Sequence, residues 1–390
     1  MQRFSSMFSQ VLQLFSRNEF ESAVRKHRAE HASKGFSCWG HLVAMLFCQL
    51  GRAHSLREIC GGLASCEGKL RHLGMSSAPK RSTLSYANEH RPWELYRTVF
   101  LQLLDRCRTA VPVKGVAKKF KFRNKLVSLD SSTIDLALSL YDWAHFRRAK
   151  GAVKLHMVLD HDGYLPSFAL ITDGKVGDIT AAKMLRFEPG TVLVMDRGYN
   201  DYEWFTQLTE QGVSFITRLK DNAAYKFAGI RPIPESLKDD IVLDWNITFN
   251  NQKRKDKTVF RIVTVRSEDR RDCYTYLTNN MDLDAVTLAA VYKDRWQIEL
   301  FFKAIKQNLK IKTFLGTSAN AVKTQIWTAL IAILLLRWLQ LRSSFGWSLS
   351  NLVALLRQQL FVYRDLWTWL DNPFEGPPQL DDGGQLSFNF

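Results

Sequence analysis

Apolar residues recur at spacings of three and four along the first 115 residues of the chain. This spacing predicts amphipathic helices at Cys38–Leu50, Leu56–Leu63 and Trp93–Leu104. Clusters of Gly and Ser separate the three segments. We therefore predict an α-helical N-terminal domain over residues 1–115.

Two short helices with Ser55 and Ser82 as N-caps are predicted inside this domain. The second carries polar side chains near its ends, which are Arg81, Asn88, His90 and Arg91. A helix-turn-helix that binds DNA fits this pattern, and so does an ordinary helical bundle with a charged surface. No base-reading pattern separates the two interpretations, and both stay open.

From residue 126 the helical pattern gives way to short β-type runs. The predicted strands are Leu126–Asp130, Val153–Gly163, Tyr164–Gly174, Thr191–Asp196 and Val213–Leu219, with helices at Ile179–Leu185 and Tyr202–Gln211. The second and third strands are expected to form a hairpin-like pair. Strands alternating with helices indicate an α/β fold, and the basic segment Val113–Lys125 is predicted to be the linker before it.

A second β-rich stretch follows at residues 236–282, with the basic turn Asn250–Lys257 at its centre. Helical spacing resumes at Asp284. We predict a β-rich insertion that interrupts the α/β domain. The remaining boundaries are 116–235 for the first part of that domain, 283–345 for its second part, and 346–390 for a C-terminal helical segment with a flexible tail.

The chain is strongly basic, with 54 Lys and Arg against 38 Asp and Glu and a formal net charge of +16. Such a charge favours a polyanionic partner, nucleic acid first and an anionic membrane second. The apolar run Ile326–Leu341 contains Arg337 and is shorter than the roughly 20 residues that span a bilayer. We interpret it as a buried helix and expect no membrane partner. The N-terminal segment is interrupted by polar residues and does not predict a signal peptide.

The six cysteines lie mostly in apolar or helical contexts and include no CxxC pair, which is typical of reduced thiols in a cytosolic protein. His54, Cys60, Cys66 and His72 follow one another at six-residue intervals, which raises the possibility of zinc. Structural zinc sites use closer ligand pairs, so core packing is the favoured interpretation.

Two predicted strands of the α/β domain end in an aspartate, Asp130 and Asp196. The carboxyl ends of strands in an open α/β sheet line its functional crevice, so these two acids can converge there. A single aspartate at a strand end is more often a cap or a turn residue. Neither residue taken alone predicts a site.

A third acid lies on the segment Ala289–Lys310, which we predict to be one helix. At about 100° per residue, Tyr292, Arg295, Glu299 and Lys306 fall within an arc of about 60°. A solvated surface with one Arg–Glu pair has the same pattern. The other faces of this helix are apolar, however, so the polar face is expected to line a site.

The spacing Y-x2-R-x3-E-x6-K of these four residues resembles the Y-R-E-K signature of DDE transposases in the insertion-sequence-four family of bacteria. The segments SLDSST at Asp130 and VMDRGYND at Asp196 are similar to the two aspartate boxes of that family, and a β-rich insertion before the glutamate is its usual architecture. The resemblance covers about residues 1–345, because the helical N-terminal region is similar to a domain found in a subset of these enzymes. It implies an RNase H-like catalytic core and an N-terminal domain that binds DNA ends.

The resemblance also implies a chemistry. Asp130, Asp196 and Glu299 would be the catalytic residues and would hold two Mg²⁺ or Mn²⁺ ions, since clustered carboxylates are the ligands that such hard cations prefer. The enzyme would cleave the terminal repeats of an insertion sequence to free 3′-hydroxyl ends, with or without a hairpin step. Those hydroxyls would then attack target DNA.

Seven residues are candidates for binding DNA. Tyr292, Arg295 and Lys306 would hold phosphates near the scissile bond. Arg197 is a weaker candidate for the same role, as are Lys154 and His156. Trp296 could stack on an unpaired base, although packing in the core is the alternative.

The chain ends in QLSFNF after a turn-rich acidic stretch. Gln385, Leu386, Phe388 and Phe390 resemble the Q-L-x-L-F type of peptide that docks on the bacterial sliding clamp, with departures at Phe388 and at the extra Asn389. A tail that packs on its own protein, or has no role, is the alternative for Gln385–Phe390.

The expected partners are double-stranded DNA, as terminal inverted repeats and as target, and a second copy of the chain in a dimer on DNA. The expected location is the bacterial cytoplasm, at the nucleoid. Two other functions share some of these features: a metal-dependent nuclease without strand transfer, and an inactive DNA-binding protein. The complete acidic triad argues against the inactive protein, and the Y-R-E-K pattern favours a transposase over the nuclease.

Overall fold

The computed structural model describes residues 5–31, 35–110, 119–137, 141, 143–147, 150–249, 258–267, 269 and 271–375. The chain forms two compact units, one made of residues 1–111 and 308–390 and the other of residues 112–307. The predicted basic turn Asn250–Lys257 and the tail Gln385–Phe390 lie outside the described residues, as does part of the predicted linker.

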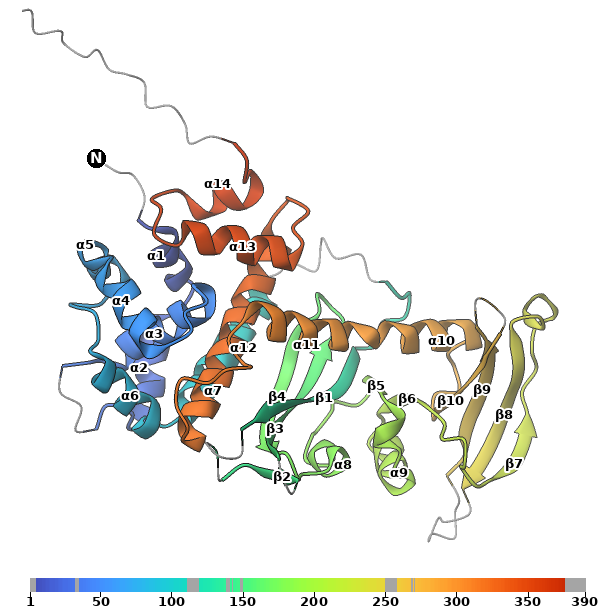
Figure 1. Cartoon of the computed structure of the whole chain (residues 1–390). Coiled ribbons are helices and arrows are strands. Elements are labelled where there is room, and N and C mark those ends of the chain that lie inside the picture. The colour runs from blue at the N-terminus through green and yellow to red at the C-terminus, as the bar shows by residue number, and fades with distance from the viewer. Residues whose placement is uncertain are drawn as a thin grey trace, which may run out of the picture. The chain divides into compact units, whose positions relative to one another are not determined.

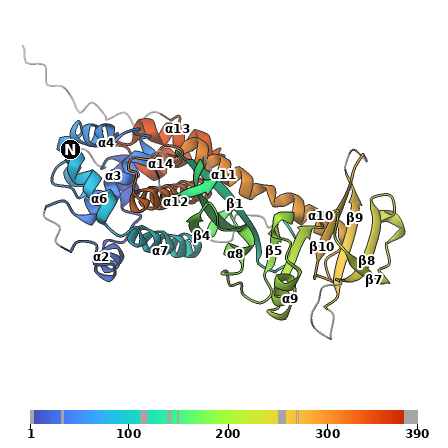
Figure 2. The same ribbon diagram turned by 60° about the horizontal axis from the view of Figure 1, so that its bottom comes forward.

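The first unit is helical and is built around α12 (Ala319–Arg342), which is apolar on nearly all sides. It packs against α3 (Cys38–Leu50), α6 (Arg81–His90), α7 (Glu94–Ala110) and α13 (Leu349–Gln359), with α3 and α7 flanking it in Figure 2. By length and composition α12 could cross a membrane, but 83% of its most apolar window is buried within the protein. This burial is typical of a core helix, as the sequence predicted for Ile326–Leu341.

The other helices of this unit are short, and most of them are capped. They are α1 (Met7–Leu12), α2 (Arg17–Lys26), α4 (Leu56–Ala64), α5 (Glu67–Leu70), η1 (Arg71–Leu73) and α14 (Leu366–Asp371). Ser55 caps α4 as predicted, because its hydroxyl accepts a hydrogen bond from the Glu58 amide. The predicted cap at Ser82 is wrong: α6 begins at Arg81, after Lys80, and its described neighbours provide no side-chain cap.

The helix-turn-helix hypothesis for α4 and α6 also needs correction. Residues 65–80 separate the two helices, and this stretch contains α5 and η1. A helix-turn-helix joins its helices by a turn of about three or four residues. The first unit is therefore a helical bundle in this region, and any DNA-binding surface on it has another form.

The division of the chain differs from the predicted one at residues 308–345. The sequence grouped them with the α/β domain, whereas the structure groups α12 with the N-terminal helices. The cause is the composition of α12, because a helix that is apolar all round must be surrounded by other elements, and the N-terminal helices surround it.

The second unit contains one mixed sheet of ten described strands. The strands are β1 (Leu126–Leu136), β2 (His145–Arg147), β3 (Lys150–Asp160), β4 (Leu165–Asp173), β5 (Val192–Met195), β6 (Ser214–Arg218), β7 (Tyr225–Ile230), β8 (Ile241–Phe249), β9 (Phe260–Arg266) and β10 (Cys273–Thr278). Their order is β2-β3-β1-β5-β6-β10-β9-β8-β7, with β4 also paired to β3. The pairs β1–β5 and β5–β6 are parallel, and the others are antiparallel. The predicted hairpin of β3 and β4 is confirmed.

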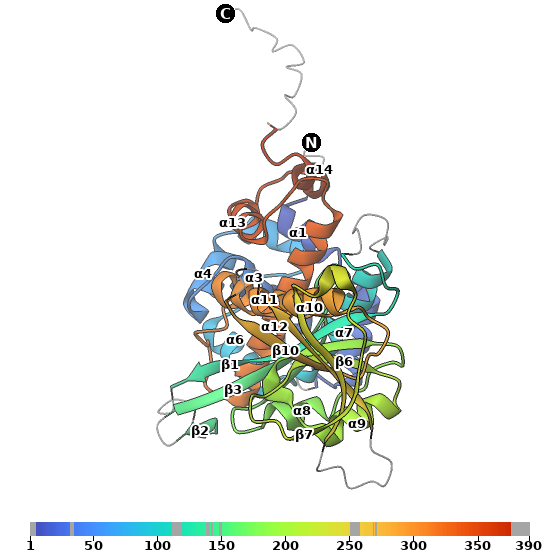
Figure 3. The ribbon, with the colours of Figure 1, turned by 90° about the vertical axis from the view of Figure 1, so that its right-hand side faces the viewer.

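Helices cover both faces of this sheet (Figures 1 and 3). On one face, α8 (Asp178–Ala182) and α9 (Tyr202–Glu210) pack on apolar side chains that include Val127 and Leu129 of β1. On the opposite face, α10 (Ala285–Asp294) packs on a cluster that includes Leu126. Alternate residues of β1 thus point to the two helical layers, as the pleat of a strand requires.

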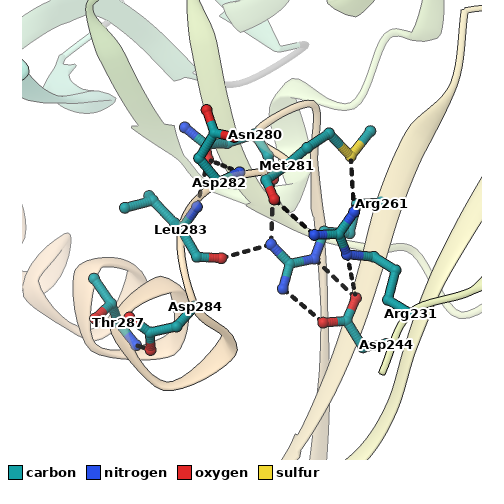
Figure 4. A network of polar contacts seen from close by, with 9 residues as sticks. All are labelled: Arg231, Asp244, Arg261, Asn280, Met281, Asp282, Leu283, Asp284 and Thr287. Carbon is teal, nitrogen blue, oxygen red and sulfur yellow. Dashed lines mark hydrogen bonds and ion pairs between the residues drawn. The ribbon is translucent and has the colours of Figure 1, made fainter. Parts of the chain in front are cut away.

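The β-rich stretch predicted at 236–282 continues the main sheet through the pairing of β10 with β6, and β7 extends it to residue 225. A buried polar network ties this extension to the start of α10 (Figure 4). Arg261 of β9 donates to both carboxylate oxygens of Asp244 on β8, at 2.8 and 2.6 Å, and to the Leu283 carbonyl at 2.6 Å. The next residue, Asp284, caps α10 by accepting the Thr287 amide.

Candidate active site

The register of two parallel strands places Asp130 beside Asp196. The parallel ladder of β1 and β5 ends at the pair Leu129 and Met195, and each aspartate is the next residue of its strand or of the turn after it. One detail of the prediction is wrong, because β1 does not end at Asp130 but continues to Leu136, paired with β3. Asp196 directly follows β5, which ends at Met195, and its carboxylate accepts the Gly198 amide at 3.1 Å.

Glu299 lies in the helical layer that contains α10, and its helix differs from the predicted one. The segment forms two consecutive helices, α10 and α11 (Trp296–Asn308), with Arg295 at the junction in αR conformation. The Arg295 amide donates to the Tyr292 carbonyl, a spacing of three residues instead of four. In Figure 1 the two helices run end to end along the sheet, so the helical direction is kept while the hydrogen bonding tightens at Arg295.

Arg295 links two of the three predicted catalytic carboxylates. Its Nη2 donates to Oε1 of Glu299 at 2.7 Å, and its Nη1 lies 4.0 Å from Oδ2 of Asp130. The side chain is buried, and among the described residues its Nε and Nη1 have no hydrogen-bond partner. The Arg295 Cζ also lies 5.4 Å from the centroid of the Tyr292 ring.

The three carboxylates are close enough to act on one another. Burial is the main cause that raises the pKa of Asp130 to about 6, and the charges of Glu299 and Asp196 raise it further. The Ser131 amide and the Arg295 cation oppose this rise. The site therefore concentrates negative charge on the α10–α11 side of β1 and offsets it in part with one arginine.

No three His, Cys, Asp or Glu side chains within the described ranges lie close enough to form a metal-binding group in this conformation. At the acidic triad, the guanidinium of Arg295 lies beside two of the three carboxylates, 4.0 Å from Asp130 and 2.7 Å from Glu299. His54, Cys60, Cys66 and His72, for which the sequence raised the possibility of zinc, do not form such a group in this conformation either.

The remaining predicted site residues differ in their surroundings. Lys306 donates through Nζ to the Thr133 carbonyl of β1 at 3.0 Å, so it is held over the same strand as Asp130. Arg197 is half-exposed and lies 3.6 Å from the exposed Asp221. Trp296 is 57% exposed, which excludes the alternative that it packs in the core.

Lys154 and His156 of β3 contact a carboxylate that the sequence did not indicate, Asp178. Lys154 donates to it at 3.2 Å and Ser131 at 2.7 Å, while Nδ1 of His156 lies 3.8 Å away. His156 is buried, and this burial lowers its pKa to about 4. It is therefore neutral at physiological pH, and Lys154 is already paired, which argues against phosphate binding by either residue.

Tyr199 is a second residue that sequence reasoning missed. Its buried hydroxyl lies among acids, and burial raises its pKa, as do the charges of Asp130, Asp178 and Asp196. The sequence offered one signal for it, because Tyr199 lies in the same VMDRGYND segment as Asp196.

Comparison with known proteins gives family matches for two parts of the chain. A model described as a transposase DDE domain matches residues 121–335, which contain all three carboxylates. A model described as a domain of unknown function, DUF4372, matches residues 3–76 in the helical unit.

Three curated relatives span most of the chain. The chain is 33% identical to a protein of Sinorhizobium fredii named as the transposase y4zB, over 79% of this chain and 85% of the relative. It is 28% identical to a protein of Geobacillus stearothermophilus named as a transposase for insertion sequence element IS5377, over 66% and 67%. It is 24% identical to a protein of Synechocystis named as a transposase for element IS4SA, over 71% and 76%.

Proposed function

This chain belongs to the family of DDE transposases, and we propose that it cleaves DNA at the terminal repeats of an insertion sequence and joins the freed 3′-hydroxyl ends to target DNA. The α/β unit with helices on both faces of a mixed sheet supports an RNase H-like catalytic core. One observation carries the proposal. Asp130 and Asp196 come from adjacent strands and lie near Glu299, and Arg295 lies beside Asp130 and Glu299.

We propose that Asp130, Asp196 and Glu299 are the catalytic carboxylates. Their oxygens are the donors that Mg²⁺ and Mn²⁺ prefer. Burial is the main cause of the raised pKa of Asp130, and the charges of Glu299 and Asp196 add to it; a divalent cation would relieve this repulsion. Two such ions held by these residues would stabilise the charge that develops on the scissile phosphate. Arg295 must release the carboxylates for this, and its two buried nitrogens without a described partner support such a change.

Four residues are proposed to hold the DNA backbone near the carboxylates. Arg295, once it has turned away from Glu299, and Lys306 supply cations, and Tyr292 supplies a phenol. Arg197, next to Asp196, is half-exposed and supplies a third cation at the rim.

Trp296 is the proposed contact for a base. Its side chain is exposed on α11 one residue after Arg295, and an exposed indole next to phosphate-binding groups suits stacking on an unpaired base. A hairpin step, if the enzyme uses one, would provide such a base.

The helical unit, which includes residues 1–110 and the helices after residue 308, is proposed to bind the ends of the element. We also propose that the enzyme acts as a dimer on DNA, because the two ends of an element must be held together for joining. Its place of action would be the bacterial nucleoid. Docking on the sliding clamp through Gln385–Phe390 stays a hypothesis based on the sequence alone.

One experiment separates the three candidate functions. The protein is incubated with Mg²⁺, a plasmid target and a DNA fragment that carries the terminal repeats flanking its own gene. Joined products support the transposase, nicks without joining support the nuclease, and bound but intact DNA supports the inactive binding protein. Asp130→Asn and Glu299→Gln are each expected to abolish cleavage while end binding is kept, and metal-dependent cutting by both variants would contradict the assignment.

A further inference from the structure

A chain of three polar side chains crosses from β1 to the α10–α11 junction, next to the proposed carboxylates. Ser128 of β1 contacts Nε2 of His161 through its hydroxyl at 2.7 Å. Nδ1 of His161 contacts Oδ2 of Asp294 at 2.6 Å. Asp294 is the last residue of α10 and the neighbour of Arg295.

The direction of these hydrogen bonds follows from the charge of Asp294. Burial alone would raise its pKa, but hydrogen bonds from His161 and Lys119 lower that pKa to about 2. An ionised carboxylate only accepts hydrogen bonds, so Nδ1 of His161 carries a proton and donates it. When Nε2 of His161 carries no proton, it accepts a hydrogen bond from the Ser128 hydroxyl.

This order of Ser, His and Asp is also that of a nucleophilic triad, but burial excludes such a use. Ser128 has no exposed surface, and the side chains of His161 and Asp294 are 6% and 1% exposed. A nucleophile must reach its substrate. The three residues therefore do not attack a substrate, and their contacts instead hold the elements that carry them in position.

Both carboxylate oxygens of Asp294 accept hydrogen bonds. Lys119 donates to Oδ1 at 2.5 Å, and the Tyr164 hydroxyl donates to Oδ2 at 3.1 Å. A buried charge with this many donors is strongly anchored, because each lost partner would leave part of the charge without compensation. The C-terminal end of α10 is thereby fixed on the sheet.

The position of this anchor matters for the site. Ser128 and Asp130 are two residues apart on a strand and therefore point to the same face of β1. Asp294 and Arg295 are adjacent at the helix junction. The Ser128–His161–Asp294 contact thus runs beside the contact between Asp130 and Arg295 and joins the same two elements.

We propose that Ser128, His161 and Asp294 are positioning residues of the transposase: they hold the α10–α11 junction on β1, so that Arg295 and Glu299 face Asp130. This inference rests on the proposed function, because it assigns a task to residues that touch neither DNA nor metal. Loss of the anchor lets the junction shift relative to β1, which spoils the carboxylate geometry, while the helical unit that we propose to bind the terminal repeats is left unchanged.

The test compares Ser128→Ala with Thr264→Val in the full chain. Both remove a buried hydroxyl with a side-chain partner from the same sheet, since Thr264 of β9 lies 2.8 Å from the Thr275 hydroxyl. Mn²⁺ binding is measured by calorimetry, and kcat and KM by cleavage of terminal-repeat DNA. Ser128→Ala is expected to weaken Mn²⁺ binding and lower kcat, each about tenfold, with KM unchanged, whereas Thr264→Val changes neither.

A second variant guards against a folding defect. Lys119 is 59% exposed, so Lys119→Gln is expected to fold normally while it removes one cation from Asp294, and its kcat should fall about threefold in the same sense. Wild-type kcat and Mn²⁺ affinity in folded Ser128→Ala, or in Lys119→Gln if the serine variant does not fold, overturns the proposal. Failure of the proposed function is separate, because the unaltered protein would then not cleave its terminal repeats at all.

Discussion

Arg295 and Glu299 are joined by a 2.7 Å hydrogen bond across one turn of the α10–α11 segment, and the same guanidinium reaches to within 4.0 Å of Asp130. A cation of the protein therefore occupies the position between two carboxylates that we propose as metal ligands. Arg295 compensates their charge in the absence of DNA, and binding of a divalent ion has to compete with it.

This competition predicts that Arg295→Gln binds Mn²⁺ more tightly than the unaltered protein when no DNA is present. The substitution removes the cation near Asp130 and Glu299 and leaves the carboxylates in place. Calorimetric titration with Mn²⁺ measures the change, which we expect to be about tenfold, equivalent to about 1.4 kcal/mol. Arg197→Gln is the matched control, since this arginine pairs with the exposed Asp221. Equal or weaker binding by Arg295→Gln would contradict the competition.

The raised pKa of Asp130 predicts a gain in stability for Asp130→Asn. The ordinary value is 3.8 and the folded value about 6, so the folded protein holds this proton to higher pH than the unfolded chain does. Stability is therefore lost as pH rises from about 4 to about 6, by at most about 3 kcal/mol, and stays lost above that range. Asparagine carries no such charge.

Thermal unfolding without divalent ions at pH 7.5 is the measurement. Asp130→Asn should melt at a higher temperature than the unaltered protein, and the difference should vanish near pH 4. Asp221→Asn is the control, because the Asp221 side chain is 93% exposed and no stability change is expected. A lower melting temperature for Asp130→Asn at pH 7.5 would show that its hydrogen bond and ion pair outweigh its burial.

The sequence predicted the convergence of the acids but not the geometry that produces it. The rule for strand ends brought Asp130 and Asp196 together, yet their adjacency depends on the pairing of Leu129 with Met195, which only the folded sheet defines. The continuation of β1 to Leu136 escaped notice because polar residues follow Asp130 and resemble a turn.

The sequence also did not predict the helix break at Arg295 or the hydrogen bonds that anchor Asp294. No Gly or Pro lies near Arg295 to indicate a break. Ser128 lies in the SLDSST segment, but no pattern singled out His161 or Asp294, and the three residues are far apart in the sequence, so only the three-dimensional structure brings them together. The sequence did predict that Arg295 and Glu299 lie side by side, because residues four apart share one face of a helix.

The buried pair of Asp244 and Arg261 predicts a large loss of stability for Arg261→Ala. This substitution leaves the buried Asp244 without its two-point partner and frees the Leu283 carbonyl before α10. Removal of one partner of a buried ion pair costs about 3–5 kcal/mol. Urea unfolding measures it, with Arg271→Ala as control because the Arg271 side chain is 85% exposed and lies 3.8 Å from Asp269. A loss below about 1 kcal/mol for Arg261→Ala would mean that Arg231, whose Nε lies 3.5 Å from Oδ1 of Asp244, replaces the partner.

Trp296 offers the clearest separation of a DNA contact from a role in folding. Its side chain is 57% exposed, so Trp296→Ala should change the free energy of unfolding by less than about 0.5 kcal/mol. If the indole stacks on a base, the same substitution removes about 1–3 kcal/mol of interaction with DNA, a loss of roughly tenfold or more.

Leu300→Ala is the matched control, because Leu300 is also exposed on α11, at 42%, but has no aromatic ring. Cleavage and joining of terminal-repeat DNA, together with fluorescence of a 2-aminopurine placed at the cleaved end, measure the effect. Equal behaviour of the two variants would assign stacking to another residue, whereas a defect in Trp296→Ala alone would make this exposed indole part of the DNA site.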